Sequence, residues 1–177
     1  MKCPSCKTPL VSDPERCPHC GFAYQELVRK FGAAPKYDAR VTDITYKELT
    51  VFELRRIDKL LTRYERKFPQ SRFCVLFLDL RIGWDLAEYT FYLANRCNFL
   101  PPAIKEADNK LVLMAVDYSS GQVAMATGYG LEPYLGEDDM RAVLEAVAAP
   151  LARKKYVAAV KLAVARTMNH LARQAAA

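Results

Sequence analysis

The segment ATGYGLE, residues 126–132, stands between a strand pattern and a helix pattern. Before it, two apolar runs at residues 111–116 and 122–127 enclose a Ser-Ser-Gly turn at 119–121, an order typical of a β-hairpin. After it, a helix pattern covers residues 137–149. We therefore expect a tight corner, in which the two glycines let the chain leave an edge strand and turn over the sheet with the tyrosine docked.

Two other interpretations of these glycines are excluded. A potassium-channel filter needs membrane helices around it, and the chain has no run of about 18 uncharged apolar residues. Its best candidate, residues 142–152, contains Glu145 and Pro150. A dinucleotide-binding loop needs a third glycine three places after the second and a helix directly behind it, but that place holds Pro133.

Upstream of the hairpin, the sequence alternates helix and strand patterns. Thr50 and Glu53 match a capping box, and apolar residues follow at steps of three and four, so a helix is expected to about Lys67. Residues 73–80 form a continuous apolar run, typical of a central strand covered on both faces. Asp85 is expected to cap a second helix, over residues 85–98.

Two helices are expected at the end of the chain, because Pro150 should separate residues 137–149 from a last helix at about 152–173. This order of elements predicts an α/β (α+β) fold, in which a mixed sheet is flanked by helices in a three-layer sandwich. No acidic residue follows position 145. The last helix and the turn before it carry the cations Arg153, Lys154, Lys155, Lys161, Arg166 and Arg173. They form either a solvated face or a contact for nucleic acid, anionic lipid or an acidic partner.

Length and composition indicate a globular chain with a small appendage. Of its 177 residues, 51% are hydrophobic and 26% charged, enough for a sizeable core. The net charge of +6 is spread along the chain, unlike the charge of a dedicated nucleic-acid binder. We expect a ribbon at residues 1–31, a linker at 32–40 and an α/β domain at 41–177. No apolar signal region opens the sequence, so the expected location is the cytoplasm.

Four of the six cysteines form two Cys-x-x-Cys knuckles. The four are Cys3, Cys6, Cys17 and Cys20. In a reducing compartment, such pairs indicate metal binding in preference to disulfides, with a redox pair as the alternative. Four thiolates complete a tetrahedral zinc site and leave no position for catalysis, so we expect a structural zinc ribbon. Cys74 and Cys97 are expected in the core.

Residues 41–173 resemble the TPM domain, a family named for thylakoid lumen and membrane proteins. The segment 126–132 is the most specific part of the resemblance. Other matching positions are Val41-Thr42-Asp43, Leu49-Thr50, Asp85 to Tyr89, Ala107-Asp108-Asn109, Pro150 and Tyr156. A family glycine is replaced by Lys110, so the turn there is expected to differ. Most relatives are exported or membrane-anchored, whereas the ribbon and the lack of a signal imply a cytoplasmic variant.

The resemblance implies two chemical properties. Some plant members of the family are described as acid phosphatases, and several members bind calcium or a similar divalent ion. On this basis Asp108 is the candidate catalytic residue. Asp43, Asp108 and Glu132 are candidate ligands of a divalent cation, with Asp117 and Glu137 as further candidates. Such an ion would polarise a phosphoryl group and lower the pKa of its bound water.

Three functions are therefore open. The preferred interpretation is a non-catalytic protein-interaction or scaffold module whose zinc ribbon docks a protein partner. The first alternative is a divalent-metal-dependent phosphatase that requires Asp108. In the second alternative, the ribbon and the basic last helix contact nucleic acid, although the ribbon lacks aromatic residues between its basic ones.

Overall fold

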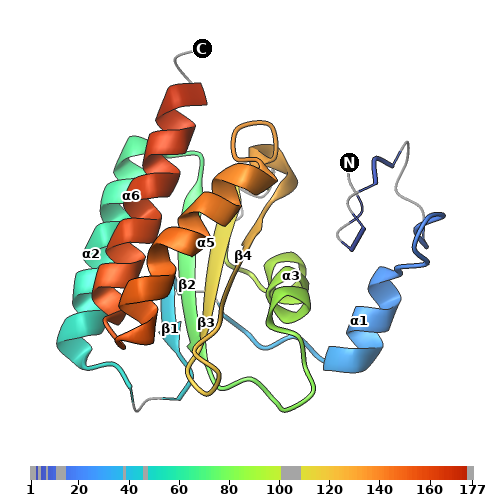
Figure 1. Cartoon of the computed structure of the whole chain (residues 1–177), viewed down its shortest axis with the longest axis horizontal. Coiled ribbons are helices and arrows are strands. Elements are labelled where there is room, and N and C mark those ends of the chain that lie inside the picture. The colour runs from blue at the N-terminus through green and yellow to red at the C-terminus, as the bar shows by residue number, and fades with distance from the viewer. Residues whose placement is uncertain are drawn as a thin grey trace.

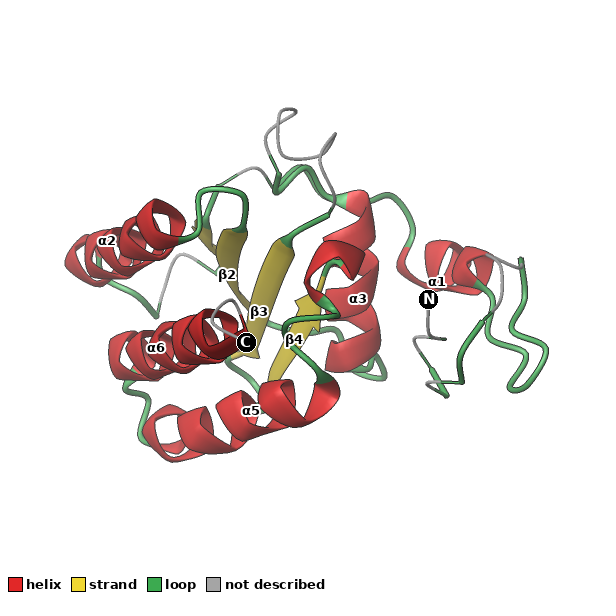
Figure 2. Ribbon diagram, turned by 90° about the horizontal axis from the view of Figure 1, so that it is seen from above, coloured by secondary structure: helices red, strands yellow, loops and turns green. Residues whose placement is uncertain are grey.

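The computed structural model describes residues 3, 5, 6, 8–10, 15–37, 39–45, 48–100 and 109–174. Among these residues a four-stranded mixed sheet lies at the centre of the larger domain, with helices on both of its faces (Figure 1). The view from above shows the three layers, and shows the N-terminal segment beside α3 (Figure 2). The predicted α/β class and mixed sheet are confirmed.

The strand order in the sheet is β1-β2-β3-β4. The bounds are Val41–Asp43 for β1, Arg72–Leu78 for β2, Leu111–Asp117 for β3 and Val123–Thr127 for β4. The first three strands are parallel, and β4 is antiparallel to β3, as expected of a hairpin. The sequence did not predict β1, because three residues are too few to show an alternating pattern.

Alternate residues of β2 face two separate cores, which explains its unbroken apolar sequence. The helices are α1 (Tyr24–Phe31), α2 (Val51–Lys67), α3 (Leu86–Arg96), α5 (Glu137–Ala152) and α6 (Tyr156–Gln174). Phe73, Val75 and Phe77 pack under α2, α5 and α6. Cys74 and Leu76 face α1 and α3 on the other side, so Cys74 is a core residue as predicted.

The two predicted helix caps are present. The Thr50 hydroxyl accepts a hydrogen bond from the Glu53 backbone at 3.3 Å, and the Glu53 carboxylate accepts one from the Thr50 backbone at 2.9 Å. The carboxylate of Asp85 accepts the backbone N–H of Glu88 at 2.8 Å. These side chains satisfy N–H groups that have no partner inside their helices.

The prediction that Pro150 ends a helix is wrong by one turn. α5 continues through Pro150 to Ala152: the proline lacks one N–H donor, and only two residues follow it in the helix. The chain reverses instead at Lys154, whose φ of 53° is in the left-handed region. Its N–H donates to the carbonyl of Leu151 at 2.8 Å. α6 therefore begins at Tyr156, later than predicted.

α1 is attached to the larger domain through aromatic contacts. The ring of Phe31 lies 4.8 Å from that of Trp84 and 5.2 Å from that of Tyr92, measured between centroids. Gly32 ends the helix with a φ of 77°, a conformation that glycine adopts without strain. Within the described ranges, no helix is long and apolar enough to cross a membrane.

Candidate metal centre and binding groove

The four N-terminal cysteines lie together, as their spacing predicted. Their sulfur atoms are all within 4.8 Å of one another. The sulfurs of Cys3 and Cys20 are 3.7 Å apart, and those of Cys6 and Cys17 are 3.8 Å apart. Four thiolates at about 2.3 Å from a tetrahedral ion would be separated by about 3.8 Å. The cluster therefore fits a tetrahedral metal ion.

The backbone around each knuckle turns sharply enough to hold these positions. The N–H of Cys3 donates to the carbonyl of Thr8 at 2.9 Å, and that of Cys17 donates to Phe22 at 2.7 Å. Gly21 follows the last cysteine with a φ of 76°, and its N–H donates to Cys17 at 2.9 Å. Two equivalent turns thus direct both thiol pairs at one point.

The thiols of the cluster differ in acidity. Hydrogen bonding to the Thr8 side chain lowers the pKa of Cys6 to about 6. The backbone N–H of Cys20 lowers the pKa of Cys17. Burial has the opposite effect on Cys3 and raises its pKa to about 11. Cys6 is therefore largely a thiolate at neutral pH, the form that binds metal, whereas Cys3 must lose its proton on metal binding.

The corner at residues 126–132 is present, but for a different reason than the sequence suggested. The φ of Gly128 is −71°, which any residue can adopt. A Cβ at Gly128 would instead overlap the carbonyl oxygen and side chain of Asn109. The N–H of Gly130 donates to that same carbonyl at 3.0 Å. The docked side chain is Leu131, which is 4% exposed, whereas Tyr129 is 40% exposed. The prediction that Tyr129 docks is therefore wrong.

Asp43, a candidate metal ligand, holds a loop of its own chain. It ends β1 and is 6% exposed. Its carboxylate accepts hydrogen bonds from the N–H and hydroxyl of Thr45 at 3.0 and 2.8 Å, and from the N–H of Leu49 at 3.3 Å. The hydroxyl of Tyr118 donates to it at 3.4 Å. Burial and the nearby Asp43 raise the pKa of Tyr118, so this hydroxyl remains protonated.

Asp117 has a similar role at the end of β3. Its carboxylate accepts the N–H of Leu80 at 2.9 Å, that of Ser119 at 3.3 Å and that of Ser120 at 3.2 Å. It therefore joins the loop after β2 to the hairpin turn. Because β1 and β3 are parallel, Asp43 and Asp117 lie at the same end of the sheet, where these two strands end.

The remaining acidic candidates lie elsewhere. Glu132 is exposed and follows the corner, which lies at the opposite end of the strands from Asp43. Glu137 is in the first turn of α5. Asp108 lies outside the described residues. The structure thus does not bring Asp43 and Glu132 together, and the only group of potential metal ligands among the described residues is the cysteine cluster.

The burial of Asp43 leads to a prediction. Changing Asp43 to Asn leaves the shape but removes a charged acceptor of four hydrogen bonds, so a loss of about 2–3 kcal/mol in the free energy of unfolding is expected. Urea unfolding measures this loss. The control Glu145→Gln, at an exposed site on α5, should change the free energy of unfolding by less than about 0.5 kcal/mol. Unchanged stability in Asp43→Asn would contradict the structural role.

A groove of about 710 Å³ lies between the larger domain and the segment before α1 that carries the four cysteines, which we call the cysteine ribbon. Its walls come from the ribbon, α3, β4 and the start of α5. The apolar part of its lining includes Phe22, Phe91, Met125, Met140 and Leu144. β4 is the last strand of the sheet, so the groove follows a sheet edge. Because these residues are far apart in sequence, no local pattern indicated the groove.

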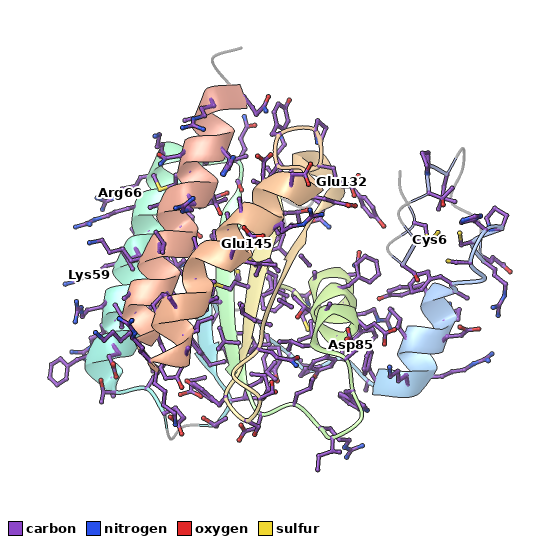
Figure 3. All side chains as sticks on the ribbon, in the orientation of Figure 1. Cys6, Lys59, Arg66, Asp85, Glu132 and Glu145 are labelled. Carbon is purple, nitrogen blue, oxygen red and sulfur yellow. The ribbon has the colours of Figure 1, made fainter. Side chains whose placement is uncertain are left out.

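Carboxylates dominate the charged lining of the groove. They are Asp85, Glu88, Glu132 and Glu137, and the one cation among the lining residues is Arg141. Lys30, outside the lining, pairs with Glu88 at 2.6 Å. Figure 3 shows Asp85 and Glu132 on the larger domain and Cys6 in the ribbon beside them. An acidic groove in a chain of net charge +6 is a local reversal of charge.

Comparison with known proteins identifies the larger domain. The family model of the TPM domain matches residues 45–170. The match covers more than half of the sequence, and the chain belongs to the TPM domain family. The resemblance seen in the sequence is therefore confirmed. No curated protein matches the chain.

Two solved structures have the same fold. The N-terminal domain of the cg2496 protein from Corynebacterium glutamicum is 16% identical, with a TM-score of 0.56 over 77% of this chain and 81% of that one. The N-terminal domain of a protein from P. gingivalis is 23% identical, with a TM-score of 0.59 over 76% of this chain and 83% of that one. At these identities the comparison shows the fold alone.

Proposed function

We propose that this chain is a non-catalytic protein-interaction module that binds a basic segment of a partner protein in the acidic groove. The observation that carries the proposal is the reversal of charge in the groove, whose lining holds four carboxylates, one of them paired with Lys30, one guanidinium and several apolar side chains. Lysine and arginine side chains combine an apolar stem with a charged end, so a segment that alternates them with apolar residues matches both parts of this lining.

In this proposal zinc has a structural role. Four thiolates occupy all positions of a tetrahedral ion, which leaves none for a substrate. The ion fixes Cys3 and Cys6, and Ser5 lies between them in the sequence. Cys3 and Ser5 line one wall of the groove. None of the six cysteines is paired in a disulfide, a state that suits a reducing compartment, so the proposal places the protein in the cytoplasm.

The carboxylates at the ends of β1 and β3 support a non-catalytic role. Asp43 and Asp117 already accept hydrogen bonds from the backbone and hydroxyl groups of adjacent loops. The alternative, a phosphatase that uses Asp108, predicts turnover of an aryl phosphate with calcium, magnesium or manganese, and its loss in Asp108→Ala. We expect no such metal-dependent turnover. Turnover that disappears in the variant would establish the enzyme instead.

The groove is tested with two short labelled peptides, one alternating lysine with leucine and the other alternating glutamate with leucine. Fluorescence anisotropy with the zinc-loaded full chain should show binding of the lysine peptide only. The double variant Glu132→Gln, Glu137→Gln should bind it about fivefold more weakly, since each exposed carboxylate contributes about 0.5 kcal/mol.

A matched pair of changes separates the groove from general charge attraction. Asp138→Asn with Glu145→Gln also removes two carboxylates, both of them on α5, but neither residue lines the groove. This control should keep the affinity of the unchanged protein. Equal weakening by both pairs, or equal binding of the two peptides, would contradict the proposal.

A further inference from the structure

The outer face of α2 carries six cations. They are Arg55, Arg56, Lys59, Arg63, Arg66 and Lys67, all of them exposed. At 100° per residue they occupy an arc of roughly 120° and extend over about 18 Å of the helix. Figure 3 shows Lys59 and Arg66 pointing away from the sheet at the edge of the molecule. We call this set the α2 basic face.

Of the acidic residues of α2, only Glu53 interacts with this face, through the charge of Arg56. Asp58 and Glu65 both pair with Arg40, each at 2.8 Å, on a different side of the helix. Glu53 is held in the capping box by Thr50. In the described part of the chain, no carboxylate lies within 4.0 Å of any of the six cations. Asp58 and Glu65 are thus directed at Arg40, Glu53 at the start of the helix and the cations at solvent.

The α2 basic face is rigidly supported. The opposite side of the helix is inserted in the core, where Ile57, Leu61 and Tyr64 are each 0% exposed. This side cannot turn outward to enter a membrane, as the apolar face of a lipid-bound helix does. What remains is a narrow, convex row of cations, four of them arginines, and the planar guanidinium group matches phosphate oxygens in a bidentate manner.

We propose that the α2 basic face binds the phosphate backbone of a nucleic acid. At 100° per residue, Arg55, Lys59 and Arg66 lie on one flank of the arc, and the other three cations lie on the other flank. The two rows can contact phosphates on both sides of a duplex groove. The six positions hold only lysine and arginine, whose charged ends pair with phosphate oxygens whatever the base sequence, so we expect binding to depend on salt more than on sequence. This differs from the expected contact through the last helix.

The test is a salt titration of the full-length, zinc-loaded chain with a labelled DNA duplex of arbitrary sequence. If six phosphates are neutralised, the affinity should fall roughly a thousandfold between about 50 and 200 mM salt. The triple variant Arg56→Gln, Lys59→Gln, Arg63→Gln should fall only about fortyfold over the same range, because three contacts are lost. Glutamine is a good helix former, so α2 should stay folded, and circular dichroism checks this.

A second triple variant provides the matched control. Lys161→Gln, Arg166→Gln and Arg173→Gln remove the same charge from exposed positions on α6. The proposal expects this variant to keep the salt dependence of the unchanged protein. An equal effect of the two triples would overturn it, as would absence of duplex binding at low salt. Binding to phosphatidylserine vesicles but not to the duplex would overturn it too and assign the face to membranes.

Discussion

Removal of the zinc ion that we propose for the cysteine cluster is expected to unfold the cysteine ribbon and leave the TPM domain folded. Structural zinc contributes an apparent 10–16 kcal/mol in zinc-finger peptides at pH 7, more than any single side chain. The ribbon needs this contribution, because Cys3 and Cys17 are its most buried described residues before α1. The TPM domain, in contrast, has a core on each face of its sheet.

Metal analysis and amide hydrogen exchange measure this effect. We expect one zinc ion per chain, lost in Cys6→Ser and in Cys17→Ser. Chelation should remove exchange protection from residues 15–22 and preserve it in β2 and β3. Cys97→Ala is the control, since Cys97 is 7% exposed and lies in the core with residues of α3, so this change should leave the zinc content unchanged.

The pH dependence of zinc binding has a defined sign. The lowered pKa of Cys6, about 6, keeps its thiolate charged above that pH and allows protonation below it. Protons therefore compete with zinc at Cys3 already at neutral pH, because its pKa is about 11, and at Cys6 as well once the pH falls below about 6, so zinc should be released on acidification. A chain that carries no zinc at neutral pH, or whose exchange is unchanged by chelation, would contradict the structural role of the ion.

Changing Gly128 to alanine is expected to destabilise the TPM domain by about 3 kcal/mol. The new Cβ would overlap the carbonyl oxygen of Asn109, which is backbone and cannot rotate away. Relieving the overlap would also stretch the hydrogen bond from the Gly128 N–H to Leu111, now 2.8 Å, at the junction of β3 and β4. For a chain of this size, the expected fall in Tm is about 6–12 °C.

Gly136→Ala is the matched control. Gly136 lies only eight residues further on, and its nearest potential contact for a Cβ is the Asp139 carboxylate at 3.8 Å, an ordinary distance. The Gly136→Ala change should lower the free energy of unfolding by less than about 1 kcal/mol. Thermal unfolding of both variants measures the difference. If Gly128→Ala were as stable as Gly136→Ala, the close approach to Asn109 would be disproved.

The features that were predicted correctly depend on short, local sequence patterns. The two Cys-x-x-Cys knuckles, the capping box at Thr50 and Glu53 and the apolar run of β2 are each contained in a few consecutive residues. Their physical meaning does not depend on the rest of the chain. The resemblance to the TPM domain also rested on a short segment, residues 126–132.

Features that depend on distant residues were not predicted. The need for glycine at 128 comes from Asn109, which folding brings against the corner. The groove joins Ser5 to Met125 and Arg141, and no sequence pattern connects such residues. The α2 basic face was also not predicted, although its pattern is local, with cations at steps of three and four. That period was used to find the buried side of the helix and not its exposed side.

The central claim is that the groove between the ribbon and the TPM domain binds a basic segment. Its most direct test is amide NMR of the zinc-loaded chain during addition of the lysine-leucine peptide. The account predicts shifts concentrated at Phe91, at 125–127 on β4 and at Glu132, with α2 unaffected. Shifts confined to other surfaces, or none at peptide concentrations that saturate the anisotropy signal, would contradict it.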